Sequence, residues 1–494
     1  MFKNPLLLIA LALTTGVSIW GIIDTQGLSN FAAEQVKITL RSRGWFVMLT
    51  ASVLLITSIV LAFSKFGQIK LGHDDDEPEF STMSWLTMMF AAGMGVGLLF
   101  YGAAEPITHY LFLAKQGVLV HKAASNALLI TLFNWGLHAW AIYGVTALVI
   151  AYFGFRKGVP QLISGPIRAT FGDHPLASGT GWLVDLLSIY AIAIGLAGSL
   201  ALGVFQVQDG IITLFNLKNT GMGLTLTIFG ILCAAYILPL TVDLSKGMVV
   251  LSNTALIIAV ALMIYLLILG PTSFLMNGIV ESIGQYFYQA LPAGFSTLAY
   301  FNEETRGWFE SWSLNYMVWW LAWAPFVGVF IARISKGRTI REFILGVLLA
   351  PTFFSIFWFG VFGGLGFYQG AVNQLDPAIV TENINQTTFL LLKNMPLPWL
   401  TIVATSIAAF LFIVTSVVSA AYVLAMFSTG GAQEPSVKIK LIWGVILGVL
   451  GLVMILSGSV GAIRNIIAMS AGPFVFIILL LLVCLLKSLK HERF

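Results

Sequence analysis

Long apolar runs constrain the fold of this chain more than any other feature. A helix needs about 20 apolar residues to cross a bilayer, and the sequence holds about twelve runs of that size. They lie near residues 5–24, 45–64, 85–112, 124–153, 181–208, 222–241, 247–271, 309–333, 341–366, 397–428, 438–460 and 465–487. The first run could also be a signal peptide, but it stays apolar to Ile23, which favours a span. The sequence predicts an all-α integral membrane protein.

The charge content excludes several other classes of protein. Charged residues make up 9% of the chain, whereas about 25% is usual in soluble domains, so disorder and nucleic-acid binding are not expected. The two cysteines, Cys233 and Cys484, lie inside apolar runs and predict neither a disulfide framework nor a thiolate metal site. No nucleophile with an adjacent base is recognisable, so we expect no enzyme and no cofactor.

The distribution of basic residues predicts the orientation in the membrane. Short cytoplasmic loops are enriched in Lys and Arg, and three basic groups fall on one side if there are twelve spans: Arg156, Lys157 and Arg168; Arg333, Lys336, Arg338 and Arg341; Lys487, Lys490 and Arg493. Lys37, Arg41 and Arg43 depart from this pattern. We expect a multi-pass protein of a bacterial-type plasma (inner) membrane with both termini in the cytoplasm.

Two of the runs contain residues that weaken a helix at membrane depth. The third includes the stretch from Ala91 to Gly97, AAGMGVG, and each of its three glycines costs about 1 kcal/mol in a helix interior. The eighth includes the stretch from Trp319 to Pro325, WWLAWAP, where proline removes a backbone donor. Interrupted segments at corresponding places in two halves are typical of inverted-repeat secondary transporters. Glycines can instead allow helices to pack closely, so this pattern alone leaves both interpretations open.

The repeat interpretation divides the chain into five parts. Residues 1–84 would hold two N-terminal spans and a cytoplasmic loop, and residues 85–271 the first five-helix repeat. Residues 272–308 would connect it to the second repeat, residues 309–487, which a short cytoplasmic tail, residues 488–494, would follow.

Three blocks of residues resemble a known family. The stretch from Phe90 to Pro106, FAAGMGVGLLFYGAAEP, is similar to the signature of the betaine/choline/carnitine transporter family. The stretch from Trp323 to Phe343 resembles it too, together with Trp135, Trp140 and Tyr143. The resemblance implies twelve helices, the amino-acid-transporter fold with two inverted five-helix repeats after two extra helices, and often a homotrimer.

Aromatic residues suit the substrates of such a family. A quaternary ammonium cannot donate hydrogen bonds, so π faces must hold it. If residues 124–153 form one helix, Trp135, Trp140 and Tyr143 share a contiguous face. Aromatic residues in membrane helices are otherwise most often interfacial or packing residues. The family pattern implies a site around the ammonium at Trp135, Trp140, Tyr143 and Trp320, with Trp319 and Trp323 close by.

The glycine segment suits the other end of a zwitterion. An opened helix offers backbone N–H groups to an anion, and we expect Met94, Gly95 and Gly97 to line the substrate site. Gly97 stands where choline carriers of the family often have an acidic residue, which favours a zwitterion such as glycine betaine. Asn315 and Met317 replace aromatic residues that betaine carriers would have, which leaves a sulfonium or a larger zwitterion open.

The resemblance also implies a coupling ion. Phe412, Thr415 and Ser416 look like the sodium-binding segment of the family, facing Ala91 and Met94. Oxygen ligands suit a small, hard cation, although such hydroxyls often bond only to their own helix. We therefore expect a sodium symporter that imports a quaternary-ammonium or related zwitterion, an osmolyte. The alternative is a sodium-independent exchanger or proton-coupled carrier of choline, carnitine, taurine or a sulfonium zwitterion.

Ionisable residues inside the runs are few. Glu105, Asp185 and His138 lie within predicted spans, where each is a functional candidate by default. We interpret them as buried polar partners or, for Glu105, a gating carboxylate. His138 and Glu105 become the candidates for proton transfer if protons replace sodium.

Overall fold

A computed structural model describes residues 4–93, 95–172, 174–218, 220–241, 245–376, 379–380 and 384–492. All regular elements in these ranges are helices, which confirms the all-α prediction. The first half contains α1 (Pro5–Ile23), α2 (Thr25–Phe63), η1 (Lys65–Gln68), α3 (Thr82–Gly93), α4 (Val96–Lys115), α5 (Val120–Trp135), α6 (Leu137–Ala151), η2 (Tyr152–Arg156), α7 (Ser164–Phe171), α8 (Pro175–Phe215), α9 (Gly221–Thr241) and α10 (Ser245–Leu269). The second contains α11 (Thr272–Gly294), α12 (Glu303–Phe309), η3 (Glu310–Leu314), α13 (Asn315–Arg333), α14 (Ile340–Ala371), η4 (Ile384–Gln386), α16 (Thr387–Lys393), α17 (Pro398–Ser428), α18 (Val437–Leu456), α19 (Val460–Ala471) and α20 (Phe474–Leu489).

The helices account for nearly all of the predicted spans. Within the described ranges, ten are long and apolar enough to cross a membrane, or eleven if α19 and α20, bent by 43°, count as one span. They coincide with each predicted run except the third, which is divided between α3 and α4. The chain is therefore a multi-pass membrane protein, while a total of twelve spans stays a prediction.

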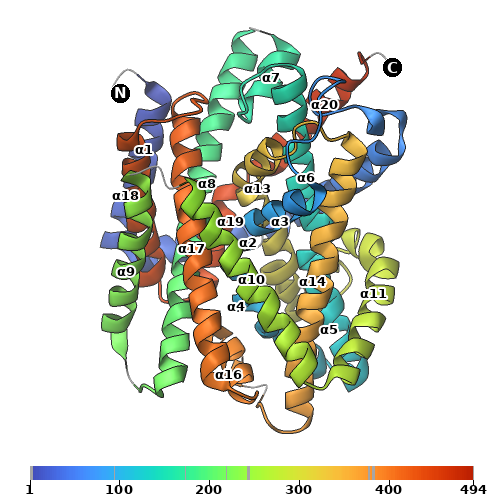
Figure 1. Cartoon of the computed structure of the whole chain (residues 1–494), viewed down its shortest axis with the longest axis vertical. Coiled ribbons are helices and arrows are strands. Elements are labelled where there is room, and N and C mark those ends of the chain that lie inside the picture. The colour runs from blue at the N-terminus through green and yellow to red at the C-terminus, as the bar shows by residue number, and fades with distance from the viewer. Residues whose placement is uncertain are drawn as a thin grey trace.

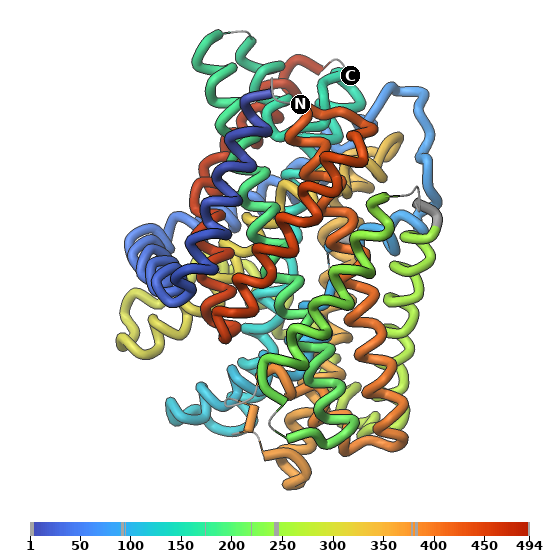
Figure 2. The backbone as a smooth tube through the Cα atoms, turned by 90° about the vertical axis from the view of Figure 1, so that its left-hand side faces the viewer, coloured from blue at the N-terminus to red at the C-terminus, as the bar shows by residue number. Residues whose placement is uncertain are grey.

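The long helices form one bundle, with both ends of the chain at the same end of it (Figure 1). α13 and α6 pack against each other in the interior, and α17 packs against α8. α2 crosses the bundle at a large angle to the other long helices and is seen almost along its own axis in Figure 2. Its 39 residues exceed the roughly 20 needed for a perpendicular crossing, as a strong tilt allows.

An ion-pair cluster ties the C-terminal end to two loops. The carboxylate of Glu492 accepts hydrogen bonds from Tyr152 at 2.6 Å, Arg156 at 3.0 Å and Lys157 at 2.6 Å. Burial alone would raise the pKa of Glu492, but these three donors lower it to about 2. Arg156 also pairs with Asp74 at 2.7 Å. The cluster places a predicted basic loop, the acidic loop after α2 and the tail at one end of the bundle.

The eighth run is not interrupted where we expected. α13 continues through Trp319 and Pro325, and the irregular turn is instead η3, a π-helical turn directly before it. A proline inside a helix removes one N–H donor, whereas the third run must absorb three glycines in five residues. The neighbouring side chains of α13 are also buried on all sides, so packing holds the helix together.

The fourth run is broken, which the sequence did not predict. α5 ends at Trp135 and α6 begins at Leu137. The hydroxyl of Tyr286, from α11, accepts the backbone N–H of Leu137 at 2.7 Å. A side chain at Gly136 would collide with that hydroxyl, so glycine is what lets the tyrosine enter the break.

Candidate functional site

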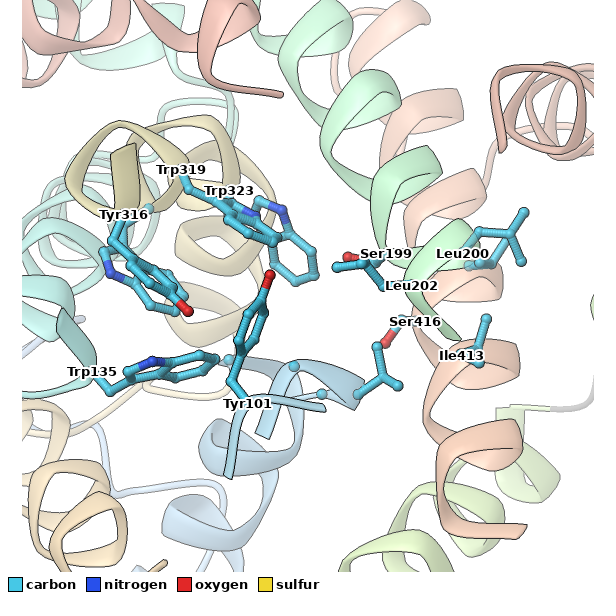
Figure 3. Close-up of a pocket in the computed structure, with 16 residues that line it drawn as sticks. Tyr101, Trp135, Ser199, Leu200, Leu202, Tyr316, Trp319, Trp323, Ile413 and Ser416 are labelled. Atoms are coloured by element: carbon cyan, nitrogen blue, oxygen red, sulfur yellow. The ribbon is translucent and has the colours of Figure 1, made fainter. Parts of the chain in front are cut away.

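A narrow cavity lies where the third run opens between α3 and α4. The cavity volume that the centres of water molecules can occupy is about 40 Å³. This is enough for roughly three waters, at 10–15 Å³ each. Figure 3 shows aromatic rings on one side of it and serine and aliphatic side chains of α8 and α17 on the other. The lining residues are Gly93, Gly95, Val96, Gly97, Tyr101, Trp135, Ser199, Leu200, Leu202, Tyr316, Trp319, Trp320, Trp323, Ile413, Ser416 and Val417.

Four of the predicted aromatic residues form a continuous series of ring contacts. Trp135 meets Trp320 at 5.1 Å between centroids, Trp320 meets Tyr143 at 5.6 Å, and Tyr143 meets Trp140 at 5.6 Å. All three contacts are edge-to-face, a preferred geometry for aromatic pairs. Trp135 and Trp320 line the cavity, whereas Trp140 lies behind Gly93, where a Cβ atom would come within 2.5 Å of its ring.

The continuous helix that we predicted to carry three of these residues is broken. Because the fourth run breaks at Gly136, Trp135 ends α5 while Trp140 and Tyr143 belong to α6. Tertiary packing, with Trp320 between Trp135 and Tyr143, brings them together instead. On α13, Tyr316, Trp320 and Trp323 all line the cavity and therefore share one face of that helix.

The glycine segment lies at the cavity. Gly95 precedes the first turn of α4, and both Gly95 and Gly97 line the space. The first backbone N–H groups of a helix have no partner within it and favour an anion. A Cβ atom at Gly97 would lie 3.1 Å from the ring of Trp135, so glycine lets the ring approach. Met94 lies outside the described residues.

The predicted sodium residues are only partly brought together. Ser416 lines the cavity, and its hydroxyl would lie 3.7 Å from a Cβ atom at Gly95. Thr415 donates its hydroxyl to the carbonyl of Leu411 at 2.9 Å, the bond within its own helix that was the alternative interpretation. Phe412 is buried. The side chain of Ala91 lies outside the described residues, as does Met94.

Glu105 organises one wall of the cavity through partners that the sequence did not predict. One of its oxygens, Oε2, accepts hydrogen bonds from the indole of Trp135 at 2.8 Å and the phenol of Tyr316 at 2.6 Å. The other, Oε1, accepts from the amide of Asn134 at 2.7 Å and from Nε2 of His109 at 3.3 Å. The carboxylate is fully buried and satisfied by these four donors, which fix two of the lining rings.

The tautomer of His109 follows from its second contact. Nδ1 of His109 accepts the indole N–H of Trp308 at 3.1 Å. Since an indole can only donate, a neutral imidazole must carry its proton on Nε2, which then donates to Glu105.

A buried arginine was missed by the sequence analysis. The guanidinium of Arg464 lies over the ring of Trp312, 4.4 Å from its centroid, and over that of Tyr316 at 5.6 Å. It also donates to the backbone carbonyl of Ser311. The available signal was a lone arginine next to the twelfth apolar run, a position where a charge is costly without partners.

Two fully buried polar groups at the cavity have no hydrogen-bond partner among the described residues. They are the indole N–H of Trp323 and the hydroxyl of Tyr101, and both residues line the space (Figure 3). Buried donors are rarely left unpaired without a reason. They are the natural candidates for contacts to a bound solute.

Comparison with known proteins identifies the family. Residues 5–494 match the profile described as BCCT, betaine/carnitine/choline family transporter. The chain is 39% identical over 98% of its length to the glycine betaine transporter OpuD of Bacillus subtilis (strain 168), covering 94% of that protein. It is 34% identical over 99% of its length to the probable glycine betaine transporter of Desulfitobacterium hafniense (strain Y51), covering 98%, and 33% identical over 96% to the betaine/ectoine transporter LcoP of Corynebacterium glutamicum, covering 75%. The chain therefore belongs to the betaine/carnitine/choline transporter family and is a transporter, not an enzyme.

Proposed function

We propose that this protein imports glycine betaine, or a closely related zwitterion, together with sodium. The observation that carries the proposal is the meeting of two chemistries at one cavity: a series of aromatic rings and the N-terminus of a half-helix. A zwitterion with a fixed cation and a carboxylate needs both. The relatives, a glycine betaine transporter, a probable glycine betaine transporter and a betaine/ectoine transporter, support the same substrate class.

The ammonium end would lie against Trp135 and Trp320, which line the cavity, with Tyr143 packed behind Trp320. Each desolvated cation–π contact contributes on the order of 2 kcal/mol. The carboxylate end would lie towards the first turn of α4 and the indole N–H of Trp323, which has no hydrogen-bond partner among the described residues. The cavity volume open to the centres of water molecules is only about 40 Å³, which is too small for glycine betaine. The rings or α4 must therefore move to admit the substrate, as alternating access requires.

The coupling proposal rests on oxygen ligands next to the broken helix. Ser416 lines the cavity beside Gly95, and the hydroxyl oxygen of Thr415 can accept a cation while its proton stays with Leu411. Sodium bound there would link α17 to the start of α4 and so complete the site. We also propose the inverted repeats at residues 85–271 and 309–487, a homotrimer, and both termini in the cytoplasm.

Uptake by purified protein in liposomes tests this function. An inward sodium gradient should drive accumulation of radiolabelled glycine betaine, and replacing sodium with potassium should abolish it. Trp320→Ala should weaken betaine binding severely, and Thr415→Ala should raise the sodium concentration needed for half-maximal uptake. Trp399→Ala is the matched control, because this tryptophan is 59% exposed at the start of α17. Undiminished uptake in both site variants would reject the site, and uptake driven by protons alone would favour the proton-coupled alternative.

A further inference from the structure

A second group of buried polar atoms lies on α8, away from the aromatic rings. Asp209, near the C-terminal end of this helix, is 6% exposed. Its Oδ1 accepts one long hydrogen bond from the amide of Gln386, at 3.4 Å, and its Oδ2 has no partner among the described residues. No basic side chain in the described part of the chain forms an ion pair with it. A buried carboxylate so poorly compensated is energetically costly.

Asp185, on the same helix, shows how a buried carboxylate is ordinarily satisfied. It accepts the backbone N–H of Ser164 at 3.1 Å and the hydroxyl of the same residue at 2.6 Å, one on each oxygen. Asp209 has no such arrangement. The difference indicates that something other than the surrounding side chains compensates Asp209.

Two neighbours of Asp209 carry further unpartnered atoms. Gln206 lies three residues earlier and therefore on the same face of α8; it is fully buried, and neither atom of its amide has a partner among the described residues. Thr387 follows Gln386 directly and begins α16; it is fully buried too, and its hydroxyl is also unpartnered there. The three residues supply a carboxylate, an amide and a hydroxyl oxygen from two elements that pack together.

The local sequence makes this approach possible. Gly210 follows Asp209, and a side chain there would collide with the hydroxyl of Ser406 on α17 and come within 3.0 Å of the Phe389 ring on α16. Glycine thus lets α16 and α17 close against α8 beside the carboxylate.

We propose that Asp209, Gln206 and Thr387 form a binding site for a monovalent alkali cation, separate from the one expected at Phe412, Thr415 and Ser416. Small, hard cations take oxygen ligands of this kind, and the positive charge would compensate the buried carboxylate.

The position of the site suggests its role. Ser199 and Leu202 line the central cavity, and Gln206 and Asp209 continue the same face of α8 at steps of three or four residues. A cation at Asp209 would therefore lie on the same face of α8 as the residues that line the cavity. The choice of sodium as the ion rests on the proposed function; the existence of the site does not.

Equilibrium binding of radioactive sodium to the purified full chain, in detergent and without substrate, tests the proposal. Asp209→Asn should remove one class of bound sodium, and Thr387→Val, which keeps the side chain shape, should weaken that class about tenfold, as expected for one lost ligand. Asp185→Asn is the matched control and should bind as the wild type does. Size-exclusion chromatography identifies a variant that does not fold, and Thr387→Val then decides.

Two outcomes separate this site from the proposed coupling. Sodium binding that persists in Thr415→Ala but is lost in Thr415→Ala with Asp209→Asn supports the site on α8, even if uptake proves independent of sodium. Equal amounts and affinities of bound sodium in the wild type, Asp209→Asn and Thr387→Val overturn it, whether or not sodium drives uptake.

Discussion

Replacing Glu105 with glutamine tests whether the buried carboxylate positions the substrate site. The substitution keeps the side chain shape but turns one acceptor oxygen into an NH₂ group. Glu105 accepts hydrogen bonds from Trp135 and Tyr316 on one oxygen and from Asn134 and His109 on the other. The expected result is a folded protein that binds glycine betaine more weakly.

The magnitude follows from the donors. If the new NH₂ faces Trp135 and Tyr316, the phenol can turn to accept it but the indole can only donate. If it faces Asn134 and His109, the amide can flip but the imidazole proton cannot leave Nε2 without losing the contact on Nδ1. Either way one buried N–H donor loses its charged acceptor, at a cost of about 1.5–3 kcal/mol. If this whole free-energy cost must be met when the site adopts its binding geometry, the Kd for glycine betaine rises roughly 10- to 150-fold.

Titration of tryptophan fluorescence with glycine betaine measures the Kd, and thermal unfolding in the same detergent reports the fold. Glu281→Gln, an exposed carboxylate on α11, is the control and should leave the Kd unchanged. A folded Glu105→Gln protein whose Kd stays within twofold of the wild type would refute the reasoning, because the rings would then be held without the carboxylate.

Three further predictions concern single side chains. Gly93→Ala should reduce uptake far more than Gly95→Ala. A Cβ atom at residue 93 would lie 2.5 Å from the ring of Trp140, whereas one at residue 95 would lie 3.7 Å from its nearest neighbour. Equal losses in a transport assay would contradict this. Trp323→Phe should leave the melting temperature within a few degrees of the wild type, since the indole N–H has no partner among the described residues. It should weaken betaine binding, measured by calorimetry, roughly tenfold or more through loss of a bond to a charged group. The stabilisation of the C-terminal end by Glu492 should be constant from pH 8 to pH 5 and should weaken only as the pH falls below about 4.5, towards the lowered pKa of about 2. A carboxylate with a lowered pKa stabilises the folded state at pH values above its pKa in the unfolded chain, and this stabilisation is lost as the carboxylate protonates. Amide exchange at the end of α20 that changed between pH 8 and pH 5 would argue against it.

The spans could be predicted because the bilayer itself sets their length. A run of about 20 apolar residues has few alternatives to a membrane-crossing helix. The opening at Gly93–Gly97 was also predictable, since three glycines weaken a helix wherever it lies. These are local properties, and the sequence states them directly.

The break at Gly136 could not be predicted in the same way. It depends on the hydroxyl of Tyr286, which is far away in the sequence and enters the gap from α11. The continuity of α13 is the opposite case, because packing overrides a proline that would weaken an isolated helix. Both differences arise from contacts between segments that are distant in the sequence, so neither can be predicted from one segment alone.

The same distinction applies to the candidate site. The aromatic residues were identified from a resemblance and from the chemistry of a quaternary ammonium, and the structure brings Trp135, Trp320 and Tyr143 together. The hydrogen bonds that orient them were not identified. Glu105 receives its donors from α4, α5 and α13, a convergence visible only once the helices are packed.

These hydrogen bonds also give the proposed substrate a direction. The indole N–H of Trp135 is bound to Glu105, and that of Trp320 donates to the carbonyl of Asn134 at 2.8 Å. Both rings therefore have their polar edges occupied and offer their π faces, which attract a cation and repel a carboxylate. Trp323 is in the reverse position, because its N–H has no partner among the described residues. We infer that a zwitterion binds with its ammonium towards Trp135 and Trp320 and its carboxylate towards Trp323. The opposite orientation would place the carboxylate against the partly negative π faces and the ammonium against the partly positive N–H.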